Sequence, residues 1–166
     1  MLFRSTGAYD FPVGEATKGY ELANVNITGT TINNLMASFT TFAAVPAALN
    51  LSECNRRYNW PALDDGKWII NAYNSSLTQI TGDGTYNLTL NNLAGSYSNA
   101  AGSAWTVMKD TVGIGAWLLN GICDTTSTVN VVRRRSMTGF SHFATAQGGI
   151  TLPIELMRFE GRNEGE

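Results

Sequence analysis

The fold is decided by the stretch Thr85-Tyr86-Asn87-Leu88-Thr89-Leu90, in which apolar and polar side chains alternate. This alternation predicts a β-strand with one face in a core and the other in water. The residues just before it are typical of a turn, Thr81-Gly82-Asp83-Gly84. On the other side of the turn lies a second strand candidate, Gly66-Lys67-Trp68-Ile69-Ile70-Asn71-Ala72-Tyr73.

Similar short segments fill the rest of the chain and are separated by turns rich in Gly, Asn and Ser. Further strands are expected at residues 9–13, 21–28, 35–42, 104–109, 115–123, 127–134, 140–146 and 152–159. Residues 43–49 are the one stretch that could form a helix, and Pro46 weakens it. The pattern predicts an all-β fold of about nine strands, an antiparallel β-sandwich or jelly roll. We expect a single domain over residues 1–159, with 160–166 as a flexible tail or linker.

The composition agrees with this fold class and excludes several others. Charged residues make up only 14% of the 166 residues, whereas the chain has 19 Thr, 16 Asn, 11 Ser and 17 Gly. These small polar residues favour strands and turns over long charged helices. The net charge of −2 gives no general attraction to nucleic acid. No apolar run is long enough to span a bilayer as a helix.

The first residues do not have the pattern of a signal peptide, because no basic segment leads an apolar stretch in residues 1–6. We therefore expect either an intracellular protein or a piece of a longer exported one. Two cysteines, Cys54 and Cys123, permit one disulfide.

The sequence offers few residues for catalysis. The one histidine, His142, lies between Phe140 and Phe143, and no Gly-x-Ser-x-Gly motif supplies a nucleophile for it. We predict that His142 sits on the outer face of a strand and has no catalytic role. One histidine and two cysteines without Cys-x-x-Cys spacing also argue against a zinc site.

Carboxylates give a weak indication of a metal or hydrolytic site. Glu53, Asp64, Asp65 and Asp83 could pair for glycoside hydrolysis, but Asp64 and Asp65 lie in a turn whose backbone amides they can bind. Calcium bound by Asp64, Asp65 or Asp83 is the alternative, because sandwich loops often supply oxygen ligands. We expect no cofactor otherwise.

Arginines and aromatic residues supply two further candidates. Arg133-Arg134-Arg135 could bind phosphate or an acidic glycan, with Arg133 and Arg135 on one strand face and Arg134 on the other. The preferred interpretation is structural, with the three charges blocking an exposed strand edge or end. Trp68, Trp105 and Trp117 are expected in the core. The candidate aromatic contacts for a glycan are Tyr58 and Trp60.

Four phrases resemble β-rich modules of large exported proteins of Bacteroidetes. The first is Thr6-Gly7-Ala8-Tyr9-Asp10-Phe11-Pro12-Val13-Gly14, which is similar to an opening G-x-Y-x-F-P-V-G. Residues 59–70 look like the middle strand of these modules, and residues 137–144 resemble their GFSDFA strand with His142 in place of Asp. The most specific phrase is Leu152-Pro153-Ile154-Glu155-Leu156-Met157-Arg158-Phe159, which resembles the LPIELLSF segment before a type IX secretion sorting region.

The resemblance implies a secreted or surface-anchored β-sandwich without known catalytic residues. An exported protein is found in an oxidising compartment, so we predict a disulfide between Cys54 and Cys123, which both lie next to predicted strand ends. The expected function is a non-enzymatic structural or adhesive module, or a subunit of a surface filament, whose partners are copies of itself or neighbouring modules. A glycan-binding module of a secreted polysaccharide-degrading enzyme is the alternative, and a viral or phage fibre or capsid jelly roll is a third.

The terminal segments suggest a route to assembly. Residues 1–6 contain Arg4 as their only charge, and residues 152–159 contain only Glu155 and Arg158. Such strands are poorly protected at a sheet edge and could add to the sheet of another copy. The residues expected to make this contact are Leu2, Phe3, Ile154, Leu156 and Phe159. The alternative is that both strands pair with other strands of the same sandwich.

Overall fold

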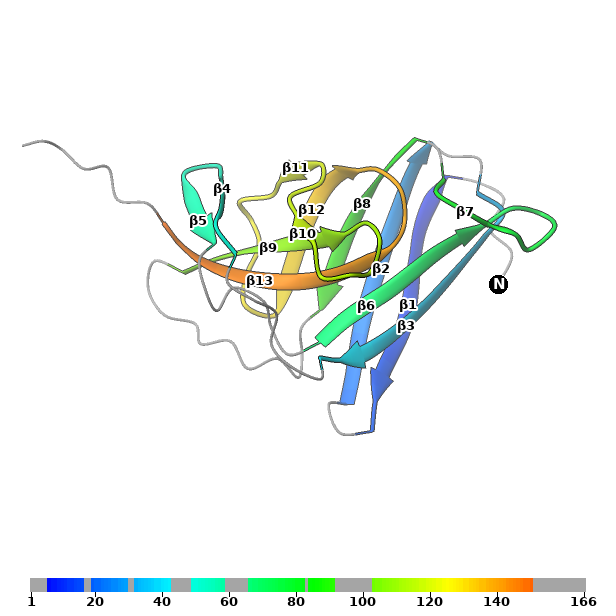
Figure 1. The fold of residues 1–166 in the computed structure, drawn as a ribbon, viewed down its shortest axis with the longest axis horizontal. Coiled ribbons are helices and arrows are strands. Elements are labelled where there is room, and N and C mark those ends of the chain that lie inside the picture. Colours follow the sequence, from blue (N-terminus) through cyan, green and yellow to red (C-terminus); the bar gives the residue numbers. More distant parts are fainter. Residues whose placement is uncertain are drawn as a thin grey trace, which may run out of the picture.

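The computed structural model describes residues 6–16, 19–29, 32–42, 49–58, 66–82, 84–91 and 103–150. Within these ranges the chain forms thirteen strands and no helix, and the strands make two antiparallel sheets (Figure 1). The predicted all-β sandwich is therefore confirmed. The strand number exceeds the expected nine because five of the strands are only two or three residues long, too short to show an alternating pattern.

The first sheet, called the small sheet below, has five strands. Their order is β1 (Gly7–Glu15), β2 (Gly19–Gly29), β8 (Thr85–Asn91), β12 (Val131–Met137) and β11 (Ile122–Cys123). The alternating residues 85–90 lie in β8, in the middle of this sheet. Its apolar residues Tyr86, Leu88 and Leu90 are buried, whereas Asn87 and Thr89 lie on the other face. The alternation read from the sequence thus sets which face of the sheet is internal.

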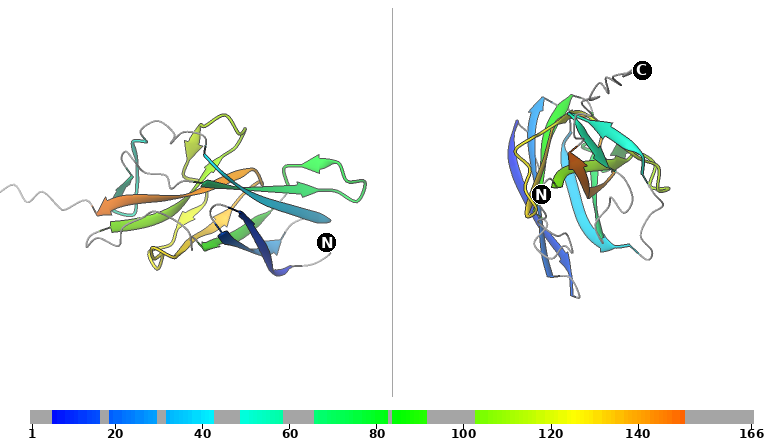
Figure 2. Two further views of the ribbon diagram at one scale, coloured as in Figure 1. Left: turned by 90° about the horizontal axis from the view of Figure 1, so that it is seen from below. Right: turned by 90° about the vertical axis from the view of Figure 1, so that its left-hand side faces the viewer.

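The second sheet, the large sheet, has eight strands built around β13. One path runs β10 (Trp117–Leu118), β9 (Ser103–Asp110), β13 (His142–Ile150), β5 (Arg56–Tyr58) and β4 (Leu51–Glu53). β6 (Gly66–Tyr73) also pairs with the start of β13, and it carries β3 (Asn34–Thr41) and β7 (Gln79–Ile80). Figure 2 shows the small and large sheets as two layers seen from the side.

The main core lies between the two sheets. Tyr86 of β8 stacks on Phe140, in the turn before β13, with ring centroids 4.2 Å apart, and it meets Phe143 of β13 edge-on at 6.4 Å. The Tyr86 hydroxyl donates a hydrogen bond of 2.7 Å to the Gly139 carbonyl, so its polar end is satisfied. Trp68 and Trp105 also belong to this core, as expected from the sequence.

A second apolar cluster lies on the opposite face of the large sheet. Alternation along β9 and β13 sends Val107 and Phe143 to the main core, and Met108 and Ala144 to the second cluster. The buried members of this cluster are Tyr58, Met108, Trp117, Ala144 and Ala146. Trp117 was expected in the core, and it is buried here with Phe42 edge-on at 5.8 Å. The large sheet is therefore covered on both faces at this end.

Three predicted strands are wrong in their extent, and the one expected at 140–146 is β13, which begins at His142 and ends at Ile150. Residues 115–123 were expected to be one strand, but β10 and β11 are separate and belong to different sheets. Gly121 lies between them with a φ of 84°, and a Cβ there would be 2.4 Å from the Arg135 carbonyl oxygen. The strand expected at 127–134 begins at Val131, because Thr128 and Val131 bond to each other in a turn. The strand expected at 152–159 and residues 43–48 lie outside the described residues.

Two adjacent glycines of β13 give a matched test of how β5 docks. A Cβ at Gly148 would lie 2.4 Å from the Arg57 carbonyl oxygen and 2.7 Å from the Tyr58 ring, whereas a Cβ at Gly149 meets nothing within 4 Å. Gly148→Ala should destabilise the protein by about 1–3 kcal/mol, because β5 must move. Gly149→Ala should be neutral or stabilising by up to about 1 kcal/mol. Urea unfolding of the two variants measures the difference; equal stabilities would contradict this docking.

Candidate functional site

Most of the candidate site residues from the sequence lie outside the described residues. Trp60, Asp64, Asp65 and Asp83 lie outside the described residues, so the glycan contact of Trp60 and the calcium site stay predictions. The same holds for the assembly residues at both ends: Leu2, Phe3, Ile154, Leu156 and Phe159. Tyr58 is described, and its proposed ligand contact is wrong. Its side chain is completely buried and belongs to the second cluster, so it has no exposed surface for a ligand.

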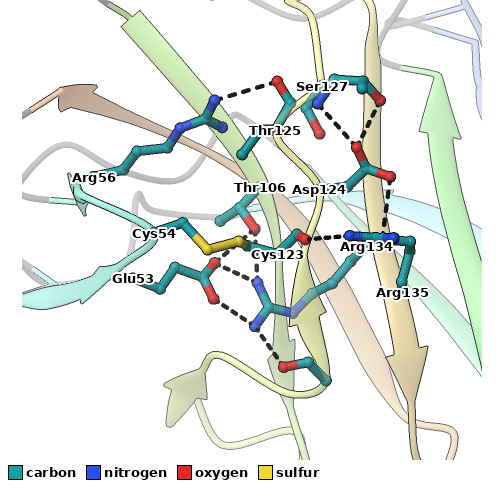
Figure 3. The surroundings of a disulfide bond; sticks show 12 residues. Glu53, Cys54, Arg56, Thr106, Cys123, Asp124, Thr125, Ser127, Arg134 and Arg135 are labelled. Carbon is teal, nitrogen blue, oxygen red and sulfur yellow. Dashed lines mark hydrogen bonds and ion pairs between the residues drawn. A yellow bond between two sulfur atoms is a disulfide. The ribbon is translucent and has the colours of Figure 1, made fainter.

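The disulfide between Cys54 and Cys123 is confirmed, and it joins the two sheets (Figure 3). Cys54 lies in the turn between β4 and β5 of the large sheet, and Cys123 lies in β11 of the small sheet. Their Cα atoms are 6.7 Å apart. Cys54 and Asn55 both have positive φ, 49° and 57°, as in the tight two-residue turns that match the twist of a hairpin. The turn therefore holds Cys54 toward the neighbouring sheet.

A buried ion pair lies beside the disulfide. The Arg134 guanidinium binds both carboxylate oxygens of Glu53, with Nη1–Oε1 at 2.5 Å and Nη2–Oε2 at 2.8 Å. Its remaining N–H groups bind the Thr106 hydroxyl at 2.8 Å, the Gly121 carbonyl at 3.3 Å and the Asn120 carbonyl. All five N–H donors of a guanidinium are thus used. The Arg134 side chain is only 1% exposed.

This burial corrects the sequence-based interpretation of the arginine run. Three outward charges at a strand edge were expected, but β12 has β8 on one side and β11 on the other. Arg134 shares the inner face with Val132, whereas Arg133 and Arg135 share the outer face. Figure 3 shows Arg134 pointing toward Glu53 while Arg135 reaches Asp124. Arg134 is therefore an interior residue with a structural role, whereas Arg133 and Arg135 are surface residues.

The two outward arginines line a hollow on the outer face of the small sheet. The hollow has a volume of about 210 Å³, and its other outward side chains are Asn24, Asn26, Asn87, Thr89 and Asp124. Strand register puts Asp10, Asn24, Thr89 and Arg133 in one row across four strands. This row and its neighbours were not found from the sequence, because they come from segments far apart in the chain.

Internal contacts orient several of these side chains. Asn24 donates to Asp10 at 2.7 Å, and Asn87 accepts from the Ser136 amide at 3.0 Å. Arg133 donates to the Thr126 carbonyl at 3.3 Å, and Arg135 lies 3.6 Å from Asp124. The pKa of Asp124 is lowered, first by the hydrogen bond from the Thr126 hydroxyl and then by its backbone amide and the two arginines. Asp124 is therefore ionised at neutral pH.

His142 occupies a different corner, at the start of β13. Its ring packs under Gly113, where a Cβ would lie 2.6 Å from Cε1. The neighbouring Asp110 accepts hydrogen bonds from the amides of Val112, Gly113 and Gly115 at 3.3, 2.9 and 2.6 Å. These contacts fix the loop over the ring. His142 lies on the face of β13 opposite Phe143, but it is half-buried under this loop, whereas an outer strand face was expected.

The lysine before Asp110 is also held by backbone groups. Lys109 is buried, and its Nζ donates to the carbonyls of Thr138 and Gly139. Burial lowers the pKa of Lys109. This corner of the molecule thus joins the end of β9 to the turn before β13.

Comparison with known proteins adds no assignment: no family model, curated protein or solved structure matches the chain. In the described ranges, no group of three or more His, Cys, Asp or Glu side chains is placed to hold a metal ion. None of the described residues builds a helix with the length and apolar character needed to cross a membrane.

The buried ion pair can be tested by removing one partner and then both. Glu53→Gln leaves the Arg134 charge buried without its counter-ion, so the free energy of unfolding should fall by about 3 kcal/mol or more. The double variant Glu53→Leu, Arg134→Met removes both charges and should recover most of that loss. Urea unfolding with the disulfide intact measures both. A double variant as unstable as the single one would contradict the ion-pair account.

The lowered pKa of His142 predicts that the protein loses stability as the pH falls. Burial, with the positive charge of Lys67, lowers its pKa below the ordinary 6.5 despite the opposing charge of Asp110. The unfolded chain therefore takes up the proton first, and stability should fall as the pH drops below about 6.5 until the folded pKa is reached. Denaturant midpoints between about pH 7.5 and pH 5 should show a drop that His142→Gln lacks. Parallel profiles for the two proteins would contradict the shift. Asp124 does not interfere, because the stability that its ionised carboxylate contributes is lost mainly below pH 3.8, the ordinary pKa of this group.

Proposed function

We propose that the chain is a non-enzymatic structural or adhesive module of an exported cell-surface or extracellular protein. The observation that carries the proposal is the disulfide between Cys54 and Cys123, which links the two sheets. Disulfides persist in oxidising compartments and are rare in the reducing cytosol. The resemblance of the sequence to exported β-rich modules supports the same compartment.

The internal contacts of three buried charged side chains support a structural role. Arg134 binds Glu53, Lys109 binds two carbonyl oxygens, and Asp110 holds a loop through three amides. Each group is fixed by contacts within the fold, whereas a catalytic acid or base must reach a substrate. These charges therefore serve to stabilise a rigid module.

The proposal is tested on cells that make the protein. Free thiols are blocked by alkylation before lysis, the cells are fractionated, and the intact mass of the chain is measured with and without reductant. We expect the chain in the medium or at the cell surface, accessible to added protease, with both thiols protected from alkylation until reductant is present. A cytosolic chain with two alkylated thiols would overturn the proposal.

A cysteine-free variant is the matched control. Cys54→Ser with Cys123→Ser opens a loop of 69 residues, and its unfolding free energy should be lower by roughly 4 kcal/mol. Reduced wild-type protein should match this variant in urea unfolding.

A further inference from the structure

We propose that the hollow on the outer face of the small sheet binds an acidic polysaccharide. The inference rests on the proposed adhesive role and names its ligand. The hollow is the one defined above, with Asn24, Asn26, Asn87, Thr89, Asp124, Arg133 and Arg135 as its outward side chains.

Its charge is opposite in sign to that of the whole chain. Among the side chains that line the hollow, Arg133 and Arg135 contribute two positive charges and Asp124 one negative charge, a net +1, whereas the chain has a net charge of −2. Asp10, at the β1 end of the same row, does not line the hollow, and its carboxylate accepts a hydrogen bond from Asn24. Arg134 also borders the hollow, but Glu53 neutralises it from the inside. Guanidinium groups bind carboxylates and sulfates through paired N–H donors. The ligand that complements the hollow therefore carries acidic groups.

The rest of the hollow suits hydroxyl groups. In the described part of the chain, the side chains of Asn26 and Thr89 make no hydrogen bond, so their polar atoms are available to a ligand. Side-chain amides both donate and accept, which matches a sugar hydroxyl. The buried interface of a protein partner, in contrast, is enriched in aromatic and apolar side chains, and the outward residues here are polar.

The hollow is formed before any ligand arrives. It lies over β2, β8 and β12, the three inner strands of the small sheet. Arg133 is oriented by the Thr126 carbonyl, and Arg135 by Asp124 and the Cys123 carbonyl. Side chains that are already ordered lose less conformational entropy on binding. A row of weak contacts along a repeating polymer can then add up.

The test uses two matched pairs of polymers and the isolated, oxidised chain. Polygalacturonate is compared with its methyl ester, and dextran sulfate with dextran, so that each pair differs in charge on one backbone. We expect affinity electrophoresis and calorimetry to detect binding to at least one charged polymer and none to its neutral partner. The pair that binds identifies carboxylate or sulfate as the acid.

Single substitutions locate the site. Arg133→Gln and Arg135→Gln should each weaken binding about tenfold, as expected for a charge-assisted hydrogen bond. Asn26→Ala should weaken it by a smaller factor, because a neutral hydrogen bond is lost. The control is Arg57→Gln, which removes an exposed arginine of β5 that binds Asn50 outside the hollow. Urea unfolding confirms that each variant is folded.

Three results would overturn the inference: no binding to either charged polymer, equal losses for Arg57→Gln and Arg133→Gln, or equally tight binding of poly-glutamate. The last would show a general affinity for polyanions, including acidic proteins. If the chain does not bind the polymers, the proposal that it is exported still stands, because the fractionation experiment does not depend on a ligand. A cytosolic chain that still binds the polymers would instead refute the proposed compartment alone.

Discussion

The buried guanidinium of Arg134 is the constraint on which the rest of the structure depends. It projects from β12 of the small sheet and binds Glu53 of β4 in the large sheet. A buried charge is tolerated only when it is paired and its hydrogen bonds are made. The β4–β5 hairpin must therefore dock where Glu53 meets Arg134. That docking also buries Tyr58 in the second cluster and brings Cys54 to Cys123.

One strand thereby serves the interior and the surface together. The inner face of β12 carries Val132 and Arg134, and its outer face carries Arg133 and Arg135. Fixing Arg134 by five hydrogen bonds also fixes the backbone from which its two neighbours project. The position of the outward arginines on the small sheet is thus a consequence of the hydrogen bonds that Arg134 makes in the interior.

Sequence reasoning reached the fold class because alternation and turns are local properties. β8 and β6 follow from their own residues, and the disulfide follows from the one pairing that two cysteines allow. The burial of Arg134 could not be predicted, because its partner Glu53 lies 81 residues away. Tyr58 was misjudged for a related reason, since strands distant in sequence bury it. The hollow depends on the register of β2, β8 and β12, which no local pattern contains.

The disulfide also determines how the module responds to mechanical tension. Once the strands outside Cys54 and Cys123 have been pulled away, the sulfur–sulfur bond carries the force, and the segment between the two cysteines is not extended. That segment spans a sequence separation of 69 residues. Fully extended, it would add roughly 230 Å of length. While the bond is intact this length is withheld, and β5, β6, β8 and β9 stay within a closed loop of the chain. Reduction would convert a short, stiff link into a long extensible one.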